Sequence, residues 1–195
     1  MRVIAGVAKG RNLLSVPGAG TRPVTDLVKG ALFNILGPDV VGATFLDLFA
    51  GTGSVGIEAL SRGASLAVFV EVARKAVATV QKNLELTGLA ERAQVIHEDV
   101  FRFLRQADPE QRFDYIYVAP PQYQDLWAKT LLALNEKPLL TAEGRIVVQI
   151  HPKEFHPLST PRLRLVDERH YGDTALYFYA LSDQGETPTE PEDVD

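Results

Sequence analysis

The stretch LDLFAGTGSVGIEAL, residues 46–60, decides the fold of this chain. An apolar run ends in Gly51-x-Gly53-x-x-Gly56, and a helical pattern begins at once. Glycines at this spacing let the backbone turn tightly and come within contact distance of a ligand, where a side chain would intrude. The stretch therefore predicts a strand, a loop that can hold a nucleoside, and a helix.

More strands alternate with helices along the rest of the chain. Between the β-rich runs, apolar residues recur at helical spacing. Such alternation predicts an α/β fold with a mostly parallel sheet and helices on both faces, because continuous apolar strands are typical of burial on both sides. The expected strands are residues 44–49, 66–71, 93–97, 113–118 and 144–150.

The two ends of the chain depart from this alternation. Residues 163–172 and 174–181 flank a Gly172-Asp173 turn signal, which predicts an antiparallel hairpin at the sheet edge. Residues 26–36 carry an apolar stripe that is typical of an amphipathic helix. Glycines and alternating apolar positions in residues 1–16 predict a small hairpin that projects from the body. With the hairpin strands the predicted sheet has seven strands.

Composition narrows the class of protein. A chain of 195 residues with 46% hydrophobic content suits one buried domain with a small appendage. No apolar run is long enough for a membrane span, and no signal peptide is evident, so a cytoplasmic protein is expected. The absence of cysteine excludes disulfides, thiol catalysis and cysteine-bound zinc, and four scattered histidines predict no metal site.

Charge is distributed unevenly along the chain. The formal net charge is −5, but the last fourteen residues hold six acids and no bases, and without them the net charge is +1. This tail has almost nothing to bury and is expected to be disordered. Residues 1–30 contain five bases against one acid, which indicates either a solvated face or a nucleic-acid contact.

Three carboxylates accompany the glycine loop. Glu71 ends the second expected strand, where it can accept hydrogen bonds from both hydroxyls of a ribose, although an ordinary solvated acid is the alternative. Asp99 follows the third strand, where it suits an adenine amino group or a helix N-cap. Asp47 lies four residues before Gly51, where an acid does not help to bind a pyrophosphate but suits a sulfonium and its amino group.

These features alone leave two enzyme classes open, because a dinucleotide oxidoreductase and a methyltransferase both place glycines after strand one and an acid after strand two. The terminal hairpin departs from the dinucleotide-binding pattern. A nicotinamide enzyme also needs a proton donor near the hydride, and no suitable His or Tyr/Lys arrangement is present. The oxidoreductase is therefore the weaker hypothesis.

Longer motifs add a family resemblance over residues 1–181. The chain resembles the bacterial RsmD family in TRPVTDLVKGALFNIL (21–36), FLDLFAGTGSVGIEALSRGA (45–64), the paired prolines after the fourth strand, and YGDTALYFY (171–179). The resemblance implies a Rossmann-like class I methyltransferase that uses S-adenosylmethionine and methylates the exocyclic N2 of a guanine in 16S ribosomal RNA. It implies three parts: a basic RNA-binding extension (1–40), a methyltransferase domain (41–181) and an acidic tail (182–195).

The resemblance also assigns roles to residues. Contacts with the amino-acid portion of the donor would come from Asp47, Phe49, Ala50, Gly51, Thr52 and Gly53. The ribose and adenine would be held by Glu71, Val72, Asp99 and Val100. The RNA-facing residues would be Arg2, Lys9, Arg11, Arg22 and Thr25.

The proline corner after residue 118 departs from the family pattern. In N-methylating relatives an acid or Asn precedes Pro-Pro, an aromatic follows, and two oxygen acceptors hold the target amine. Here Ala119 replaces the acid, and Tyr123 comes one residue late because Gln122 intervenes after Pro120 and Pro121. We expect the Pro120 carbonyl to be the first acceptor and the Gln122 side-chain carbonyl the second, while Tyr123 stacks on the base.

The unusual sequence of this corner leaves two functions open for the protein. An active methyltransferase of 16S ribosomal RNA, or of a partly assembled small subunit, is the main hypothesis. A donor-binding but inactive assembly factor is the alternative, because Ala119 removes an acceptor. A monomer is the default expectation, without membrane or metal partners.

Overall fold

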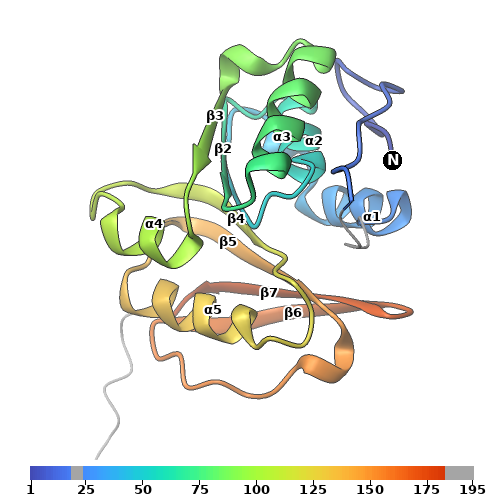
Figure 1. The fold of residues 1–195 in the computed structure, drawn as a ribbon. Coiled ribbons are helices and arrows are strands. Elements are labelled where there is room, and N and C mark those ends of the chain that lie inside the picture. Colours follow the sequence, from blue (N-terminus) through green and yellow to red (C-terminus); the bar gives the residue numbers. More distant parts are fainter. Residues whose placement is uncertain (19–23, 183–195) are drawn as a thin grey trace, which may run out of the picture.

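A seven-stranded sheet runs through the centre of the molecule, and helices cover both of its faces (Figure 1). The computed structural model describes residues 1–18 and 24–182. The strand order is β3-β2-β1-β4-β5-β7-β6, in which β1 to β5 are parallel and β7 is antiparallel to both of its neighbours. The strands are β1 (Thr44–Leu48), β2 (Leu66–Glu71), β3 (Ala93–His97), β4 (Phe113–Val118), β5 (Leu140–Ile150), β6 (Leu163–Tyr171) and β7 (Thr174–Leu181).

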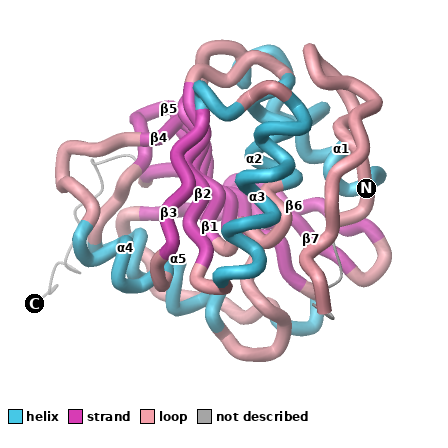
Figure 2. The backbone as a smooth tube through the Cα atoms, turned by 45° about the horizontal axis from the view of Figure 1, so that its top comes forward, coloured by secondary structure: helices cyan, strands magenta, loops and turns pink. Residues whose placement is uncertain are grey.

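The helices form one layer on each face of the sheet (Figure 2). Successive strand residues point to opposite faces, so Phe45 packs in one core with Phe33, while Leu46 packs in the other with Trp127. The first core lies under α1 (Asp26–Leu36), α2 (Ser54–Ser61) and α3 (Arg74–Thr87). The second lies under α4 (Val100–Gln106) and α5 (Leu126–Glu136). Short 3-10 turns occur at η1 (Gly37–Val40), η2 (Ala90–Arg92) and η3 (Pro152–Glu154).

The predicted α/β class, the seven-stranded sheet and the antiparallel C-terminal hairpin are confirmed. Three strand boundaries were wrong. Strand β6 ends at Tyr171, one residue before the expected Gly172. Strand β1 ends one residue early, because Phe49 turns into the left-handed region with φ 64°. Strand β5 begins four residues early, at Leu140, which pairs with Phe113 before the register shifts. The sequence TAEG after Leu140 has no strand pattern, so its extension depends on that pairing.

The N-terminal arm, residues 1–16, lies against α2 and α3 and does not project from the body as predicted (Figure 1). It closes on itself through one antiparallel bridge between Arg2 and Asn12, so it is a hairpin without regular strands. Gly6 lies so close to α2 that a Cβ would stand 1.8 Å from the carbonyl oxygen of Ser61. The apolar side chains of the arm that are buried are those of Val3, Ala8 and Leu13. Alternation predicted a hairpin, but only the tertiary structure supplies the surface that covers its apolar side.

Candidate active site

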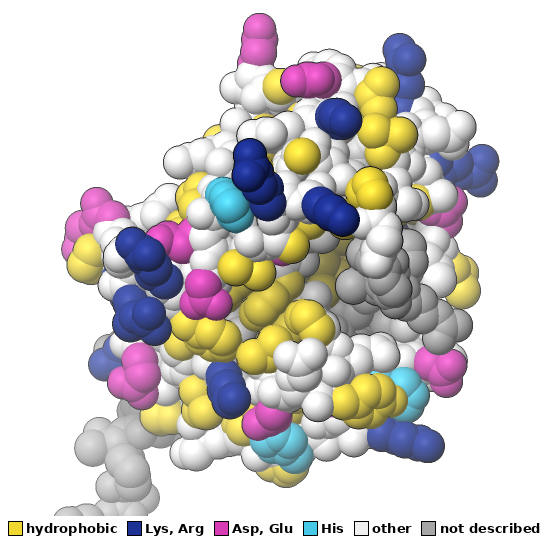
Figure 3. All heavy atoms as spheres, viewed as in Figure 1, with side chains coloured by type: hydrophobic (Ala, Val, Ile, Leu, Met, Phe, Trp, Pro, Cys, Tyr) yellow, Lys and Arg dark blue, Asp and Glu magenta, His cyan; other side chains and the backbone are white. Residues whose placement is uncertain are grey.

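The glycine loop and the proline corner leave the sheet side by side. They follow β1 and β4, which are neighbours, and the chain then continues from β1 towards β2 and from β4 towards β5. Ligands of open α/β sheets bind where the connections diverge in this way, at the carboxyl ends of the strands. In Figure 3 this part of the molecule is hollowed, and hydrophobic side chains line the hollow.

The glycine loop holds a strained backbone. Phe49, Gly51 and Gly53 all have positive φ, at 64°, 57° and 75°, and the Gly53 N–H donates to the carbonyl of Ala50 (2.7 Å). A non-glycine residue in this region carries strain that the surrounding structure must offset. Gly56 has another role, because a Cβ there would lie 2.4 Å from Cε1 of Phe69 and separate α2 from β2.

Asp47 is buried at the end of β1 and points at the start of α2. Its Oδ2 accepts the backbone N–H of Gly56 (3.1 Å). Burial raises the pKa of Asp47 to about 8; the Gly56 N–H opposes this rise and the negative charge of Glu71 adds to it. A carboxyl group with a pKa near neutral pH is suited to binding a cationic ligand, because the positive charge of the ligand would favour the carboxylate form.

Glu71 is fixed across the mouth of the glycine loop. Its Oε2 accepts the N–H of Gly51 (2.9 Å) and its Oε1 accepts the N–H of Ala73 (2.8 Å). The predicted ribose acceptor therefore has a set position relative to the loop. Val72 beside it exposes 62% of its surface, and its carbonyl lies 3.0 Å from Nε2 of His97.

Asp99 is the N-cap of α4, the alternative that the sequence left open. Its Oδ1 accepts the N–H groups of Phe101 and Arg102, both at 3.0 Å. The side chain of Val100 is buried in the second core, so any contact it makes with an adenine has to come from its backbone. Both residues nevertheless follow β3 at the carboxyl edge of the sheet, two strands from β1.

The proline corner presents a buried and an exposed half. Pro120 is buried and Ala119 half-buried, whereas Pro121, Gln122 and Tyr123 are exposed. Tyr123 exposes 67% of its surface and has φ 60°, a strained conformation for an aromatic residue. An exposed ring held in this way is available for stacking.

A segment that sequence reasoning missed holds the corner in place. Oε1 of Glu154 accepts the N–H of Tyr123 (2.6 Å), and the ring of His151 lies 5.9 Å from the Tyr123 ring. Nε2 of His156 lies 2.9 Å from Oδ1 of Asp125, which also has positive φ, and this bond raises the pKa of His156. About thirty residues separate the two partners of each contact, so no local sequence pattern predicts these contacts.

A partly buried hydrogen bond joins β4 to β5 just before the corner. The hydroxyl of Tyr117 donates to Oε1 of Gln149 (2.5 Å), and Tyr117 is the register partner of Asp47. Burial, and then the charge of Asp47, raise the pKa of Tyr117 well above its ordinary value. This phenol therefore stays protonated at neutral pH and acts as a hydrogen-bond donor to Gln149.

The predicted RNA-facing residues fall into different environments. Arg2 forms an ion pair with Asp26 (3.4 Å), while Lys9 and Arg11 are exposed on the arm. The hydroxyl of Thr25 caps α1 by accepting the N–H of Val28 (3.2 Å). Arg22 lies outside the described residues, as does the predicted acidic tail beyond residue 182.

One base of the N-terminal region does not reach the surface. Lys29 is fully buried beside Glu58, with 3.5 Å between Nζ and Oε2, and burial lowers its pKa. The surface charge of residues 1–30 is therefore smaller than the sequence indicated. Further exposed bases lie on α3 and α4; they are Arg74, Lys75, Lys82, Arg102 and Arg105. Figure 3 shows several Lys and Arg side chains on the face of the molecule that carries the hollow.

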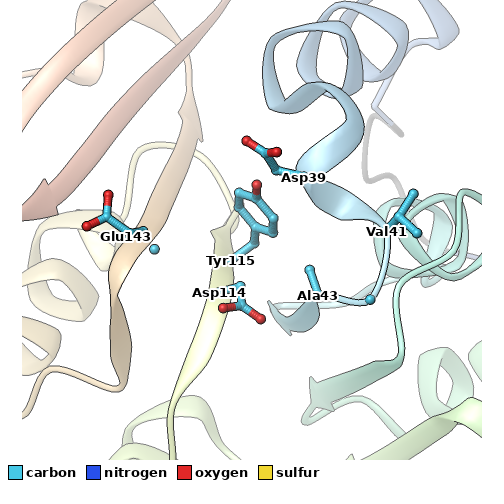
Figure 4. Close-up of a pocket in the computed structure, with 8 residues that line it drawn as sticks. Asp39, Val41, Ala43, Asp114, Tyr115 and Glu143 are labelled. Carbon is cyan, nitrogen blue, oxygen red and sulfur yellow. The ribbon is translucent and has the colours of Figure 1, made fainter.

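A cavity of about 330 Å³ lies at the opposite edge of the sheet, where β1 and β4 begin (Figure 4). Asp39, Tyr115 and Glu143 line it. Its Asp114 already accepts hydrogen bonds from the N–H and hydroxyl of Thr44 at 2.8 and 3.0 Å, so this carboxylate is committed to joining strands. The cavity is remote from both functional loops and is not part of the candidate site.

Neither a metal site nor a membrane span is found in the part of the chain that the structure describes. Within residues 1–18 and 24–182, no three His, Asp or Glu side chains are grouped so that they could bind a metal ion. Within the same ranges, no helix has both the length and the apolar character needed to cross a bilayer.

Comparisons with known proteins give a consistent result. The family model described as Conserved hypothetical protein 95 matches residues 1–180. The Bacillus subtilis protein YlbH is 41% identical over 92% of this chain and 98% of its own, and Ribosomal RNA small subunit methyltransferase D of Haemophilus influenzae is 36% identical over 92% and 93%. The solved structure of yhhF from Escherichia coli superposes with a TM-score of 0.81 at 34% identity, covering 93% of this chain and 97% of that one.

Proposed function

This chain belongs to the RsmD family of ribosomal RNA methyltransferases, and we propose that it transfers a methyl group from S-adenosylmethionine to the exocyclic N2 of a guanine in 16S ribosomal RNA. We propose guanine(966)-N(2) as the position that is methylated, because the motifs of this chain resemble those of that family. Residues 1–40 would form the RNA-binding extension and residues 41–181 the catalytic domain.

One observation carries the donor site: the buried carboxyl group of Asp47 faces the glycine loop with its pKa raised to about 8. The donor supplies an activated methyl group on a positively charged sulfur. Its ammonium group and sulfonium would lie near Asp47, while the backbone of Gly51 and Gly53 admits its amino-acid portion. Glu71, already oriented by two N–H groups, would hold the ribose hydroxyls.

The corner would orient the acceptor amine. A guanine N2 is a weak nucleophile because its lone pair is delocalised into the ring, and two acceptors that draw its N–H bonds out of plane expose that lone pair. The Pro120 carbonyl and the Gln122 side chain are the proposed acceptors. As the N–C bond forms and the S–C bond breaks, the amine loses one proton to solvent. The exposed Tyr123 ring would stack on a base that has left its helix.

Gln122→Ala tests the second acceptor. Loss of a hydrogen bond to the reacting amine costs about 1.5–3 kcal/mol, or about 10- to 150-fold in rate if it is felt only in the transition state. We expect this fall in kcat with unchanged donor affinity. Single-turnover transfer of labelled methyl groups measures it, and a rate equal to that of the wild type removes Gln122 from the mechanism.

The overall proposal is tested with labelled donor and unmodified small-subunit particles or RNA. Label in the RNA, recovered as N2-methylguanosine by mass spectrometry of nucleosides, is the expected result. The alternative is a donor-binding assembly factor, which the loss of an acceptor at Ala119 favours. Donor binding without transfer to RNA or particles would support that alternative and reject the enzyme.

A further inference from the structure

The side chain of Asn83, on α3, joins two segments that are far from it in the sequence. It is 0% exposed. Its Oδ1 accepts the backbone N–H of Leu14 (2.7 Å), and its Nδ2 donates to the carbonyl oxygens of Leu14 (3.1 Å) and Thr52 (2.9 Å). Leu14 belongs to the N-terminal arm and Thr52 to the glycine loop. A single amide therefore holds the arm and the loop together.

The glycine loop has few internal means of fixing the Thr52 carbonyl. Thr52 stands between Gly51 and Gly53, both at positive φ, and glycine has the widest conformational freedom of any residue. The direction of this carbonyl therefore depends on its bond to Asn83. A second contact with the arm is the Thr52 hydroxyl, which donates to Sδ of Met1 (3.5 Å).

We propose that Asn83 couples the arm to the glycine loop, so that a donor in the loop and RNA on the arm strengthen each other's binding. Because Asn83 is buried, lifting the arm would break both bonds to Leu14 and leave the Asn83 amide with only the Thr52 carbonyl as a protein partner. States with a docked arm thus favour the loop geometry that admits the donor. Coupling between two binding sites is reciprocal. The inference rests on the proposed function for the identity of the two ligands.

The far end of the arm offers a way to loosen it without touching Asn83. There the carboxylate of Glu58 accepts the N–H groups of Ile4 (2.8 Å) and Ala5 (3.0 Å), and Gly6 lies against Ser61. A methyl group on Gly6 would clash with the Ser61 carbonyl and would strain a residue at φ 80°. Gly6→Ala should therefore undock this end while it leaves the glycine loop intact.

The test uses the full chain and S-adenosylhomocysteine, the demethylated product of the donor. Calorimetry should show binding at least about fivefold weaker in Asn83→Ala and in Gly6→Ala than in the wild type, the lower end of typical coupling. The matched control is Asn135→Ala. Asn135 is a buried asparagine on α5 whose Oδ1 accepts the N–H of Arg162 (2.9 Å), and it contacts neither the arm nor the loop. The affinity of Asn135→Ala for S-adenosylhomocysteine should equal that of the wild type.

Hydrogen exchange supplies a readout that a merely structural role would not move. S-adenosylhomocysteine should slow amide exchange at Ile4 and Ala5, which bond to Glu58 and not to Asn83, in the wild type and in Asn135→Ala. The slowing should be absent in Asn83→Ala. Should Asn83→Ala fail to fold, as judged by circular dichroism, Gly6→Ala carries the comparison of affinities.

The outcomes separate the coupling from the proposed function. Equal affinity in folded Gly6→Ala and wild type, or product binding without slower exchange at Ile4 and Ala5, overturns the coupling while the donor site stands. A wild type that binds no product overturns both. With an unmodified small-subunit RNA transcript, RNA should tighten product binding and product should tighten RNA binding, and linkage makes the two factors equal. Equal factors therefore check only that both titrations reached equilibrium, whereas the absence of any tightening rejects the coupling. If neither the transcript nor unmodified small-subunit particles bind, the proposed substrate and the RNA half of the coupling fall together.

Discussion

At the scale of single residues, the site combines groups that are unfavourable for stability. Asp47 is a carboxyl group without a buried cation partner, and Phe49, Tyr123 and Asp125 occupy a backbone region that side chains rarely adopt. Such features persist only where the surrounding structure imposes them, and they cluster at functional sites. Here they lie at the end of β1 and in the two loops that leave β1 and β4.

Asp47→Asn should stabilise the unliganded protein and weaken donor binding. The folded-state pKa of Asp47, about 8, exceeds the ordinary value of 3.8, so the folded protein retains a proton that the unfolded chain releases, and stability falls as pH rises between these values. Asparagine does not titrate. Between pH 5 and pH 9, the variant should gain on the order of 4 kcal/mol relative to the wild type in urea unfolding.

The same substitution should remove a pH dependence of binding. If the cationic donor binds beside Asp47 as proposed, it favours the carboxylate form. Wild-type affinity should then rise from pH 6 to 7.5 with release of a proton, and the variant should bind about 10- to 150-fold more weakly with little dependence on pH. Calorimetry in buffers of different ionisation enthalpy counts the protons. Proton release that persists in Asp47→Asn would assign it to another group.

Glu154→Ala should slow methyl transfer, because it frees the N–H of Tyr123 and with it the strained corner. The loss of one hydrogen bond to a carboxylate corresponds to about tenfold or more in kcat, while donor affinity should stay unchanged. Glu154→Gln keeps an acceptor and should recover much of the rate. Exposed Glu110, before β4, gives the control Glu110→Ala. Equal rates in Glu154→Ala and this control would show that the conformation of the corner does not depend on Glu154.

At the scale of elements, packing distances decide what each helix tolerates. Helix α2 lies close to β2 because Gly56 has no side chain to meet the Phe69 ring. Helix α1, in contrast, carries Gly30 where the nearest atom to an added Cβ, Cδ1 of Ile4, would be 3.7 Å away, an ordinary contact. The position of Gly56 thus requires the absence of a side chain, whereas the position of Gly30 has room for a methyl group.

Gly30→Ala and Gly56→Ala should change stability in opposite directions. Alanine favours a helix over glycine by about 1 kcal/mol, so Gly30→Ala should raise the free energy of unfolding by that amount. Gly56→Ala should lower it by about 1–3 kcal/mol, because the new Cβ would overlap the Phe69 ring. Denaturant unfolding of both variants gives the comparison; a shift of the same sign in the two would refute the packing account.

At the scale of the whole molecule, the arm, α3 and α4 all carry exposed bases although the formal net charge is −5. Arg2 is partly neutralised by Asp26, and Lys29 on α1 is buried with Glu58, so the count of bases in residues 1–30 overstates the charge that this region offers to RNA. Lys9 and Arg11 carry most of that charge.

Lys9→Gln and Arg11→Gln should each make the salt dependence of RNA binding shallower. Each phosphate contact contributes about 0.7–0.9 to the slope of log K against log salt concentration, so each variant should lose about that much, and Arg2→Gln less. Filter binding to small-subunit RNA at several salt concentrations measures the slopes. Arg112→Gln, before β4 at the opposite edge, is the control; an equal loss there would mean that RNA binding does not involve the arm specifically.

The sequence by itself determined the strand and helix order, the ligand loop after β1 and the corner after β4. These features depend on local periodicity and on glycine and proline, whose conformational limits act within a few residues. Only the tertiary structure decided where the N-terminal arm lies, that Lys29 is buried, and that Glu154 and Asn83 fix the two functional loops. Those partners are between 29 and 69 residues apart. A hydrogen bond over such a distance along the chain leaves no periodic trace, because its two ends meet only after the sheet has formed.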